Sequence, residues 1–223
     1  MEHHQGRQHP EDRPGYALQQ DSEVRTQEAR SGVKIYVVPI HRPRTTNLEF
    51  LAEAIAAHFH IPATVLNVTV DLERAYDRYR NQYHSTDFLS QLLDARPDDG
   101  VRILGVTDLD LFIPILTYVF GEAQLDGHAA VISCHRLRNE LYGLPADNKL
   151  LQSRLLKEAI HELGHTFGLV HCDEPTCVMR VSTYVEEIDF KSADFCASCQ
   201  AQVDRAVASV RNSFQWRTRK ASE

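Results

Sequence analysis

The chain has 223 residues, long enough for one domain with a substantial core, and its hydrophobic fraction of 43% and charged fraction of 25% are typical of globular proteins. Its formal net charge of −7 argues against a dedicated nucleic-acid-binding protein, which needs clustered lysine and arginine residues to contact phosphates. The sequence has no apolar run of about 18 residues, so we expect no membrane-spanning segment.

Residues 1–31 are polar and charged and contain few large apolar side chains. This composition predicts a disordered extension, and we assign no role to its histidines. The segment also lacks the apolar core that a secretory signal needs, which favours a protein that stays in a reducing cytoplasm. We expect one domain over residues 32–214 and a flexible tail over residues 215–223.

The first half of the domain alternates between strand-like and helix-like segments. A β-branched apolar run at residues 33–40 predicts a strand that is buried on both faces. Residues 47–60 predict an amphipathic helix. Its helical spacing is carried by five apolar residues: Leu48, Leu51, Ala52, Ile55 and Phe59. Further strands are predicted at residues 63–70, 101–112, 117–123 and 129–133, and the segment 117–123 is a candidate edge strand.

This alternation predicts a mixed α/β (α+β) fold with a twisted, mostly parallel sheet of five strands. The second half of the domain has a different pattern, with a helix over residues 148–167, a loop, and a last helix near residues 200–214. The apolar face of the last helix is marked by four residues: Val203, Val207, Val210 and Phe214.

The helix at residues 148–167 has a histidine pair opposite its apolar stripe. The stripe consists of four residues at helical spacing: Leu156, Ile160, Leu163 and Phe167. His161 and His165 look outward into a cleft in this arrangement, and residues four apart on a helix can bind one ion. Glu162 is turned aside from that ion, so its carboxylate can deprotonate a zinc-bound water. By itself this short motif leaves open that the polar residues are only solvated side chains.

Gly168 and His171 extend the motif to His-Glu-x-x-His-x-x-Gly-x-x-His. Glycine is the usual residue where a helix ends in a left-handed conformation, and it permits a sharp reversal of the chain. The reversal can bring His171 back beneath the helix as a third ligand. Three protein ligands and one water are typical of a catalytic zinc, so the longer motif favours a metal centre over a solvated helix face.

Four of the five cysteines fall within 28 residues: Cys172, Cys177, Cys196 and Cys199. In a reducing compartment such a cluster more often binds a metal than forms disulfides, although free or disulfide-bonded cysteines remain the alternative. Four thiolates predict a closed tetrahedral zinc site with no position for water.

The histidine motif, Met179 and the cysteine spacing together resemble the archaemetzincins, a family in the metzincin clan of zinc peptidases. The resemblance covers roughly residues 33–200. It implies a metzincin-like fold with an upper subdomain (32–168) that holds the sheet and the active-site helix. A smaller lower subdomain (169–214) then holds a turn around Met179, which supports the metal site, and the last helix. The resemblance also implies two zinc ions per chain, one catalytic and one structural.

The same resemblance implies that the protein hydrolyses peptide bonds in a peptide or protein substrate, which lies extended beside the edge strand at residues 117–123. We expect a monomer without nucleic-acid or membrane partners. Tyr184 is a candidate donor to the tetrahedral intermediate, although such a tyrosine more often serves packing. Glu158 is predicted to be a solvated charge, and Cys134 a buried small apolar residue.

Two other functions compete with the peptidase. A metal-dependent RNA hydrolase is one alternative, because a bacterial endoribonuclease family binds zinc through three histidines at this spacing. That family lacks the glutamate, so Glu162 and the acidic composition count against it. A non-catalytic, zinc-stabilised binding module is the other alternative, and it gives no reason for a general base beside the histidines.

Overall fold

The computed structural model describes residues 32–41 and 47–220. Residues from Val33 onward group into one compact unit by their contacts. The extension predicted at residues 1–31 lies outside the described residues.

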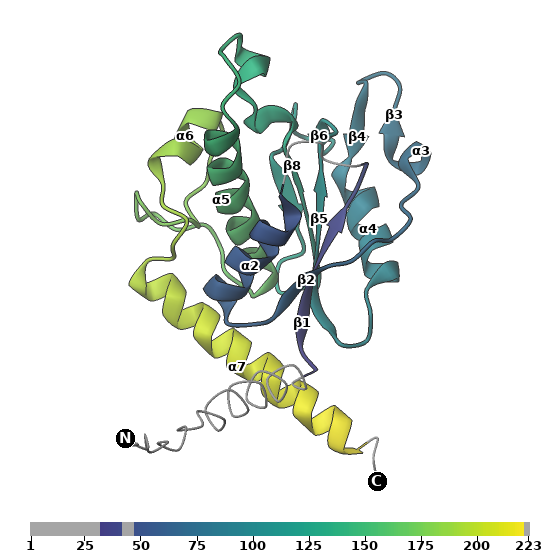
Figure 1. Cartoon of the computed structure of the whole chain (residues 1–223), viewed down its shortest axis with the longest axis vertical. Coiled ribbons are helices and arrows are strands. Elements are labelled where there is room, and N and C mark those ends of the chain that lie inside the picture. The colour runs from purple at the N-terminus through teal and green to yellow at the C-terminus, as the bar shows by residue number, and fades with distance from the viewer. Residues whose placement is uncertain (1–31, 42–46, 221–223) are drawn as a thin grey trace, which may run out of the picture. The chain divides into compact units, whose positions relative to one another are not determined.

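A five-stranded sheet forms the centre of this unit (Figure 1). Its strands are β1 (Lys34–Pro39), β2 (Ala63–Val65), β5 (Gly100–Thr107), β7 (Gly121–Ala123) and β8 (Ala129–Ser133). They lie in the order β2-β1-β5-β8-β7, and every pair is parallel except β7 with β8. The prediction of a mostly parallel five-stranded sheet is therefore confirmed, and β7 is its antiparallel edge.

Helices cover both faces of this sheet (Figure 1). One face packs against α2 (Leu48–Phe59) and α5 (Asn148–Thr166), and the other packs against α4 (Ser85–Ala95). The alternation along β1 explains the two layers, because Ile35 and Val37 belong to the core under α2 and α5 whereas Val38 belongs to the core under α4.

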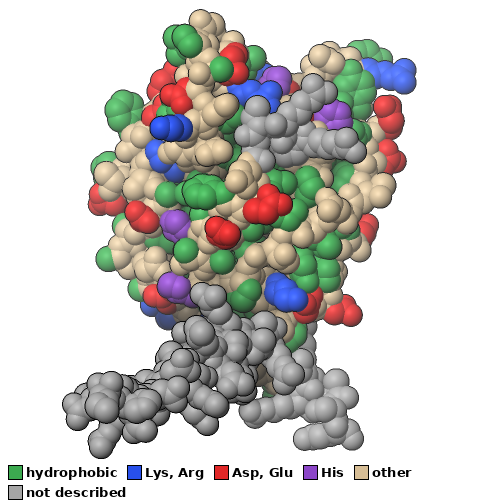
Figure 2. Space-filling view, viewed as in Figure 1, with side chains coloured by type: hydrophobic (Ala, Val, Ile, Leu, Met, Phe, Trp, Pro, Cys, Tyr) green, Lys and Arg blue, Asp and Glu red, His purple; other side chains and the backbone are tan. Residues whose placement is uncertain are grey.

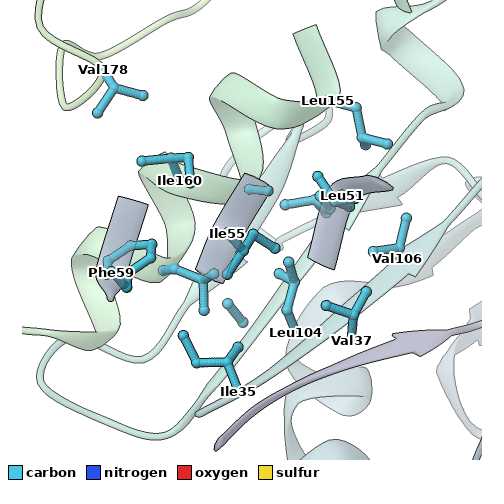
Figure 3. Packing of buried hydrophobic residues seen from close by; sticks show 14 of the residues in the cluster. Ile35, Val37, Leu51, Ile55, Phe59, Leu104, Val106, Leu155, Ile160 and Val178 are labelled. Carbon is cyan, nitrogen blue, oxygen red and sulfur yellow. The ribbon is translucent and has the colours of Figure 1, made fainter. Parts of the chain in front are cut away.

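The larger core is built from one face of the sheet and the inward faces of α2 and α5. Figure 3 shows ten of its residues turned toward one another: Ile35, Val37, Leu51, Ile55, Phe59, Leu104, Val106, Leu155, Ile160 and Val178. Val178 comes from the loop after α5, so this loop packs into the same core as the sheet. The loop is thereby held in place beside the histidine helix.

Two predicted strands are shorter in the structure. The strand expected at residues 63–70 ends at Val65, because the next bond of the parallel ladder would need an amide hydrogen from Pro39, which proline lacks. The strand expected at residues 117–123 is regular only over β7, although Val119 also forms an isolated bridge with Leu111.

A second, smaller sheet lies beside the first and was not predicted. It contains β3 (Tyr76–Asp77), β4 (Gln82–His84) and β6 (Leu111–Phe112), and a short helix, α3 (Leu72–Ala75), precedes it. The strand expected over residues 101–112 is therefore divided into β5 and β6. The division occurs where the Thr107 hydroxyl accepts a hydrogen bond from the Leu109 amide and turns the chain.

The rest of the chain contains the 3-10 turns η1 (His135–Leu137) and η2 (Asn139–Tyr142) and the helices α6 (Val185–Phe190) and α7 (Ala197–Lys220). The last helix thus runs beyond residue 214 into the segment that was expected to be a tail. Within the described residues, no helix is long and apolar enough to cross a membrane. On the face drawn in Figure 2, acidic and basic side chains are interspersed with apolar and neutral ones.

Candidate metal centre and active site

Helix α5 begins at an Asp147 cap, whose carboxylate accepts hydrogen bonds from the amides of Lys149 and Leu150. Its second half is enclosed on all sides, and every residue from Glu158 to Gly164 is buried. The sequence predicted that the imidazoles of His161 and His165 look outward into a cleft. This face borders a cavity, but His161 is merely 5% exposed.

The imidazoles of His161 and His165 point their Nε2 atoms at each other, 3.1 Å apart. The opposite ring nitrogens are both used: His161 Nδ1 donates to the Val178 carbonyl at 2.8 Å, and His165 Nδ1 donates to the Leu169 carbonyl at 2.7 Å. Each neutral ring therefore presents an Nε2 lone pair to the same point, an arrangement that is unfavourable without a cation between them. Two nitrogens bound to one tetrahedral zinc at about 2.1 Å lie about 3.4 Å apart, so the spacing fits the ion.

Gly168 reverses the chain after α5 and brings the third histidine to the pair. Its φ of +88° is left-handed, and the Leu169 amide donates back to the Gly164 carbonyl at 3.1 Å. After this turn the His171 ring centroid lies 5.3 Å from that of His161 and 5.0 Å from that of His165. One ligand atom from each of the three histidines falls within 4.8 Å of the others. The turn predicted from Gly168 is thus present, and it assembles the three predicted ligands.

Burial keeps these imidazoles neutral. It lowers the pKa of His161 well below the usual value, and the Lys191 ammonium lowers that pKa further. The pKa values of His165 and His171 are lowered as well, chiefly by burial. Neutral imidazole is the form that binds a metal ion.

Met179 lies directly against the histidine helix. A Cβ atom added to Gly164 would meet the Met179 sulfur at 2.5 Å, so glycine is needed at this position for the close approach. The Met179 carbonyl accepts a hydrogen bond from the Cys172 amide at 3.0 Å, which also positions the neighbouring His171. Sequence reasoning selected Met179 and missed Gly164, whose place inside the motif is the signal that was available.

Glu162 points toward the edge strand β7. A Cβ atom added to Gly121 on that strand would lie 2.7 Å from Glu162 Cγ, so only glycine lets the strand approach the carboxylate so closely. Burial raises the pKa of the Glu162 carboxyl well above its usual value, and the carboxylates of Glu158 and Glu122 raise it further. A carboxyl group with a raised pKa in a cavity is suited to accept a proton and release it again.

Glu158 is not a solvated charge, and that prediction is wrong. It is 4% exposed, and its Oε1 lies 3.2 Å from Nζ of Lys191, which is 2% exposed. Lys191 also donates to the Arg180 carbonyl at 3.2 Å and so joins the loop after Met179 to α5. The helical pattern placed Glu158 near the histidine face but gave no sign that the loop before α7 covers it. Cys134, by contrast, is fully buried as predicted.

A cavity of about 630 Å³ opens beside the histidines and Glu162. One part of its wall is the segment from Leu116 to Gly121, and another part is the loop from Val181 to Tyr184. The Tyr118 hydroxyl donates to the Thr183 carbonyl at 2.9 Å and joins these two parts. Tyr184 lines the cavity and is 63% exposed.

The four predicted cysteine ligands also meet in the structure. One sulfur from each of Cys172, Cys177, Cys196 and Cys199 lies within 4.8 Å of the others. Two of these sulfurs, those of Cys172 and Cys196, are 3.8 Å apart, and two thiolates on one tetrahedral zinc at about 2.3 Å are separated by about the same distance. The amide of Cys199 lowers the pKa of the Cys196 thiol to about 7, whereas burial raises the pKa values of the Cys177 and Cys199 thiols.

Comparison with known proteins identifies the family. Residues 45–205 match the family described as Peptidase family M54. An archaemetzincin of Pyrococcus furiosus is 41% identical over 176 residues, which are 76% of this chain and 92% of that protein. The chain belongs to the archaemetzincin family.

Solved archaemetzincin structures have the same fold. The archaemetzincin of Methanopyrus kandleri superposes with a TM-score of 0.70 at 34% identity, over 80% of this chain and 97% of that one. A zinc-dependent peptidase from Methanocorpusculum labreanum gives a TM-score of 0.69 at 32% identity, over 76% and 99%. This archaemetzincin is accordingly a zinc metallopeptidase, as the resemblance implied.

Proposed function

We propose that this archaemetzincin hydrolyses peptide bonds with a catalytic zinc held by His161, His165 and His171 and with Glu162 as the general base. The proposal rests on the Nε2 atoms of His161 and His165, which lie 3.1 Å apart and point at each other. The Nδ1 atoms of both rings donate hydrogen bonds to backbone carbonyls. Such carbonyl partners orient metal-binding histidines and select the tautomer that binds.

A zinc ion held by these three histidines would supply a Lewis acid that polarises the scissile carbonyl and makes water more acidic. Glu162 accepts the proton of the attacking water and passes it to the leaving amine, which its raised pKa favours. Gly121 leaves room for this carboxylate at the edge strand. Tyr184 borders the same cavity, where its hydroxyl is a candidate donor to the tetrahedral intermediate.

A second zinc is proposed at Cys172, Cys177, Cys196 and Cys199, so that each chain binds two ions. The sulfur spacing of 3.8 Å supports tetrahedral thiolate coordination. Cys172 directly follows His171, and Cys199 belongs to α7. Such a site therefore joins the third histidine to the start of the last helix, and its role is structural.

We propose that the substrate is an extended peptide segment that pairs with β7. This strand is an edge of the sheet, so its outer backbone groups are available for strand addition. The protein's net charge of −7 repels the phosphates of RNA, and this favours a peptide as the substrate. We further propose that the protein acts as a cytoplasmic monomer without nucleic-acid or membrane partners.

The direct test is incubation of the zinc-loaded protein with an unbiased peptide library and, in parallel, with structured RNA. We expect cleavage of peptides that stops when the metal is removed. Metal-dependent cleavage of RNA alone would favour the RNA hydrolase, whereas tight zinc binding with no cleavage of either polymer would favour the binding module.

A further inference from the structure

A second cavity, of about 660 Å³, contains none of the residues proposed for catalysis or metal binding. The hairpin of β3 and β4 supplies much of its lining, and Figure 1 shows this hairpin on the same side of the main sheet as α4. We call this cavity the hairpin pocket. Its lining consists of residues 74–80, His84, Asp87, Phe112 and Pro114. Three arginines and two aspartates are among these residues, so the pocket is locally basic in a chain whose net charge is −7.

The two aspartates of the hairpin pocket already have partners within the protein. Asp77 Oδ1 accepts hydrogen bonds from two backbone amides of the hairpin turn, at 2.8 and 3.1 Å. Asp87 Oδ2 lies 3.2 Å from His84 Nδ1, and Asp87 Oδ1 lies 3.8 Å from Arg74 Nε. Both carboxylates therefore serve contacts inside the fold.

The side chains of Arg78 and Tyr79, in the turn of the hairpin, are open to solvent. Arg78 is exposed, and it forms no hydrogen bond or ion pair with the described residues. Tyr79 is 102% exposed. Arginine and tyrosine are enriched among the residues that contribute most to binding at protein interfaces. Two such side chains, side by side and turned away from the fold, indicate a surface that contacts another molecule.

Arg80 connects the hairpin pocket to the active-site cavity beside Glu162. Its Nη2 atom donates to the carbonyls of Leu116 and Thr117 at 2.7 and 3.1 Å, and both of these residues line the active-site cavity. Its guanidinium also lies 4.2 Å from the ring centroid of Phe112, which lines the hairpin pocket. A single side chain therefore borders the hairpin pocket and contacts the wall of the active-site cavity.

Building on the proposed hydrolysis, we propose that the hairpin pocket binds an acidic segment of the peptide substrate, a few residues away from the scissile bond. A substrate carboxylate pairs with the guanidinium of Arg78, and such a charged, bidentate pair is stronger than a hydrogen bond between neutral groups. The ring of Tyr79 offers apolar contact to the neighbouring part of the segment. An extended chain covers about 3.3 Å per residue, so a peptide paired with β7 needs only a few more residues to reach the pocket.

Other partners fit this surface less well. A basic segment meets three arginines, and both aspartates are already bonded. A single-stranded nucleic acid can also pair its phosphates with arginine and stack its bases on tyrosine. The net charge of the whole chain repels that polymer, however, and the connection to a peptidase cavity favours a peptide.

The first test uses pairs of peptides that the zinc-loaded enzyme cleaves and that differ only in Glu or Gln at one position, with each position tested in turn. At one or more positions away from the cleaved bond, we expect KM to be at least about threefold lower for the Glu peptide. The kcat values should be similar, because a contact remote from the reacting bond stabilises the ground state and the transition state equally. In about 1 M salt the difference should shrink, since salt screens exposed charges. Equal KM values at every position overturn the inference.

A second test changes the pocket instead of the peptide. We expect Arg78→Glu to lose the preference for the Glu peptide and Arg78→Lys, which keeps the charge, to retain part of it. The matched control is Arg205→Glu, the same change at an exposed arginine of α7 that lines neither cavity. This control should keep the preference. An unchanged preference in Arg78→Glu contradicts the inference, and so does an equal loss in both Glu variants, because net charge alone would then be responsible.

Binding without turnover separates this inference from the proposed hydrolysis. Immobilised, zinc-loaded Glu162→Gln protein is incubated with an unbiased peptide library, and we expect Asp and Glu to be enriched among the bound peptides. The enrichment should disappear in Glu162→Gln/Arg78→Glu. If the wild-type enzyme cleaves no peptide but this enrichment appears, the proposed hydrolysis fails and the pocket assignment stands. If peptides are cleaved without any such enrichment, only the pocket assignment fails.

A parallel incubation of the same immobilised protein with single-stranded RNA tests the other polymer. We expect acidic peptides to be retained more strongly than RNA. Retention of RNA that depends on Arg78, without retention of acidic peptides, would make the hairpin pocket a nucleic-acid site and overturn the inference.

Discussion

The histidine cluster and the cysteine cluster use the same chain region in different ways. Each brings its ligand atoms within 4.8 Å, but the three histidines come from one helix and the turn after it, whereas the four cysteines come from two loop segments and the start of α7. The histidine cluster borders a cavity, and its three proposed ligands would leave one coordination position of a zinc ion free. Four thiolates complete a tetrahedron. This difference matches the proposed roles, in which the histidine cluster takes part in the reaction and the cysteine cluster holds loops together.

The largest expected effect tests the reactive side of this comparison. Glu162→Gln should lower kcat by about 100- to 10,000-fold, because the water loses its proton acceptor. Zinc content, measured by atomic emission, and melting temperature should stay near wild type, since Glu162 is not one of the three proposed ligands. Glu53→Gln, which changes an exposed carboxylate on α2, is the control. Full turnover in the Glu162 variant would exclude the proposed base, and loss of zinc would make Glu162 a ligand.

The next largest expected effect tests the proposed structural role of the cysteine cluster. Cys196→Ser/Cys199→Ser should reduce zinc from two ions per chain to one and lower the melting temperature by at least about 10 °C, because metal binding at this site contributes folding free energy. Activity should fall secondarily through a loosened His171. Cys134→Ala, outside the cluster, should keep both ions. Native mass spectrometry that finds a single zinc in the wild type, or a disulfide among the four cysteines, would refute the second site.

Chelation should separate the two clusters in time. The histidine site opens onto a cavity, so a chelator should remove its zinc first and abolish activity while most of the thermal stability remains. Loss of the thiolate-bound zinc should follow more slowly, with unfolding. Zinc release recorded with a colorimetric indicator, alongside circular dichroism, should therefore show two phases. Simultaneous release and unfolding would indicate that the clusters form one cooperative unit.

A smaller effect tests how closely Met179 supports the histidines. In Gly164→Ala the new methyl group would fall 2.5 Å from the Met179 sulfur and must displace it. We expect the affinity for the catalytic zinc to fall by about tenfold, the lower end for residues that support metal ligands. Competition with a fluorescent chelator measures this change. Shortening the partner in Gly164→Ala/Met179→Ala should recover part of the affinity if the collision is the cause.

The smallest effect concerns pH. Glu162 must be ionised to act as a base, so kcat/KM falls as the pH decreases through its raised pKa. Removing the nearby negative charge with Glu122→Gln should lower that pKa and move the acid limb of the pH–rate profile to lower pH by a fraction of a unit. The profile of each enzyme, measured with one peptide between about pH 4 and 9, gives the shift. If the acid limb of the Glu122→Gln profile moves to higher pH, the Glu122 charge does not raise the pKa of Glu162.

Sequence reasoning recovered most of what depends on local patterns. The strands buried on both faces and the helix with His161, Glu162 and His165 follow from periodicity, and Gly168 follows from its conformational freedom. The two sets of candidate ligands were selected from their spacing, and the structure brings the residues of each set together. Sequence reasoning missed the features that depend on contacts between distant segments. These are the small sheet around β4, the approach of Gly121 to Glu162, and the burial of Glu158 under Lys191. No periodicity within one segment encodes a partner about thirty to forty residues away.

The hydrogen bond that orients His161 also has a consequence for biosynthesis. Its acceptor is the Val178 carbonyl, and the Val178 amide in turn donates to the Asp194 carbonyl at 3.0 Å. A chain emerging from the ribosome therefore presents the histidine helix before the residues that anchor its orienting partner have been added. Hydrolytic competence should arise only once the segment through Asp194 has emerged, so a nascent chain would pose little danger to its neighbours.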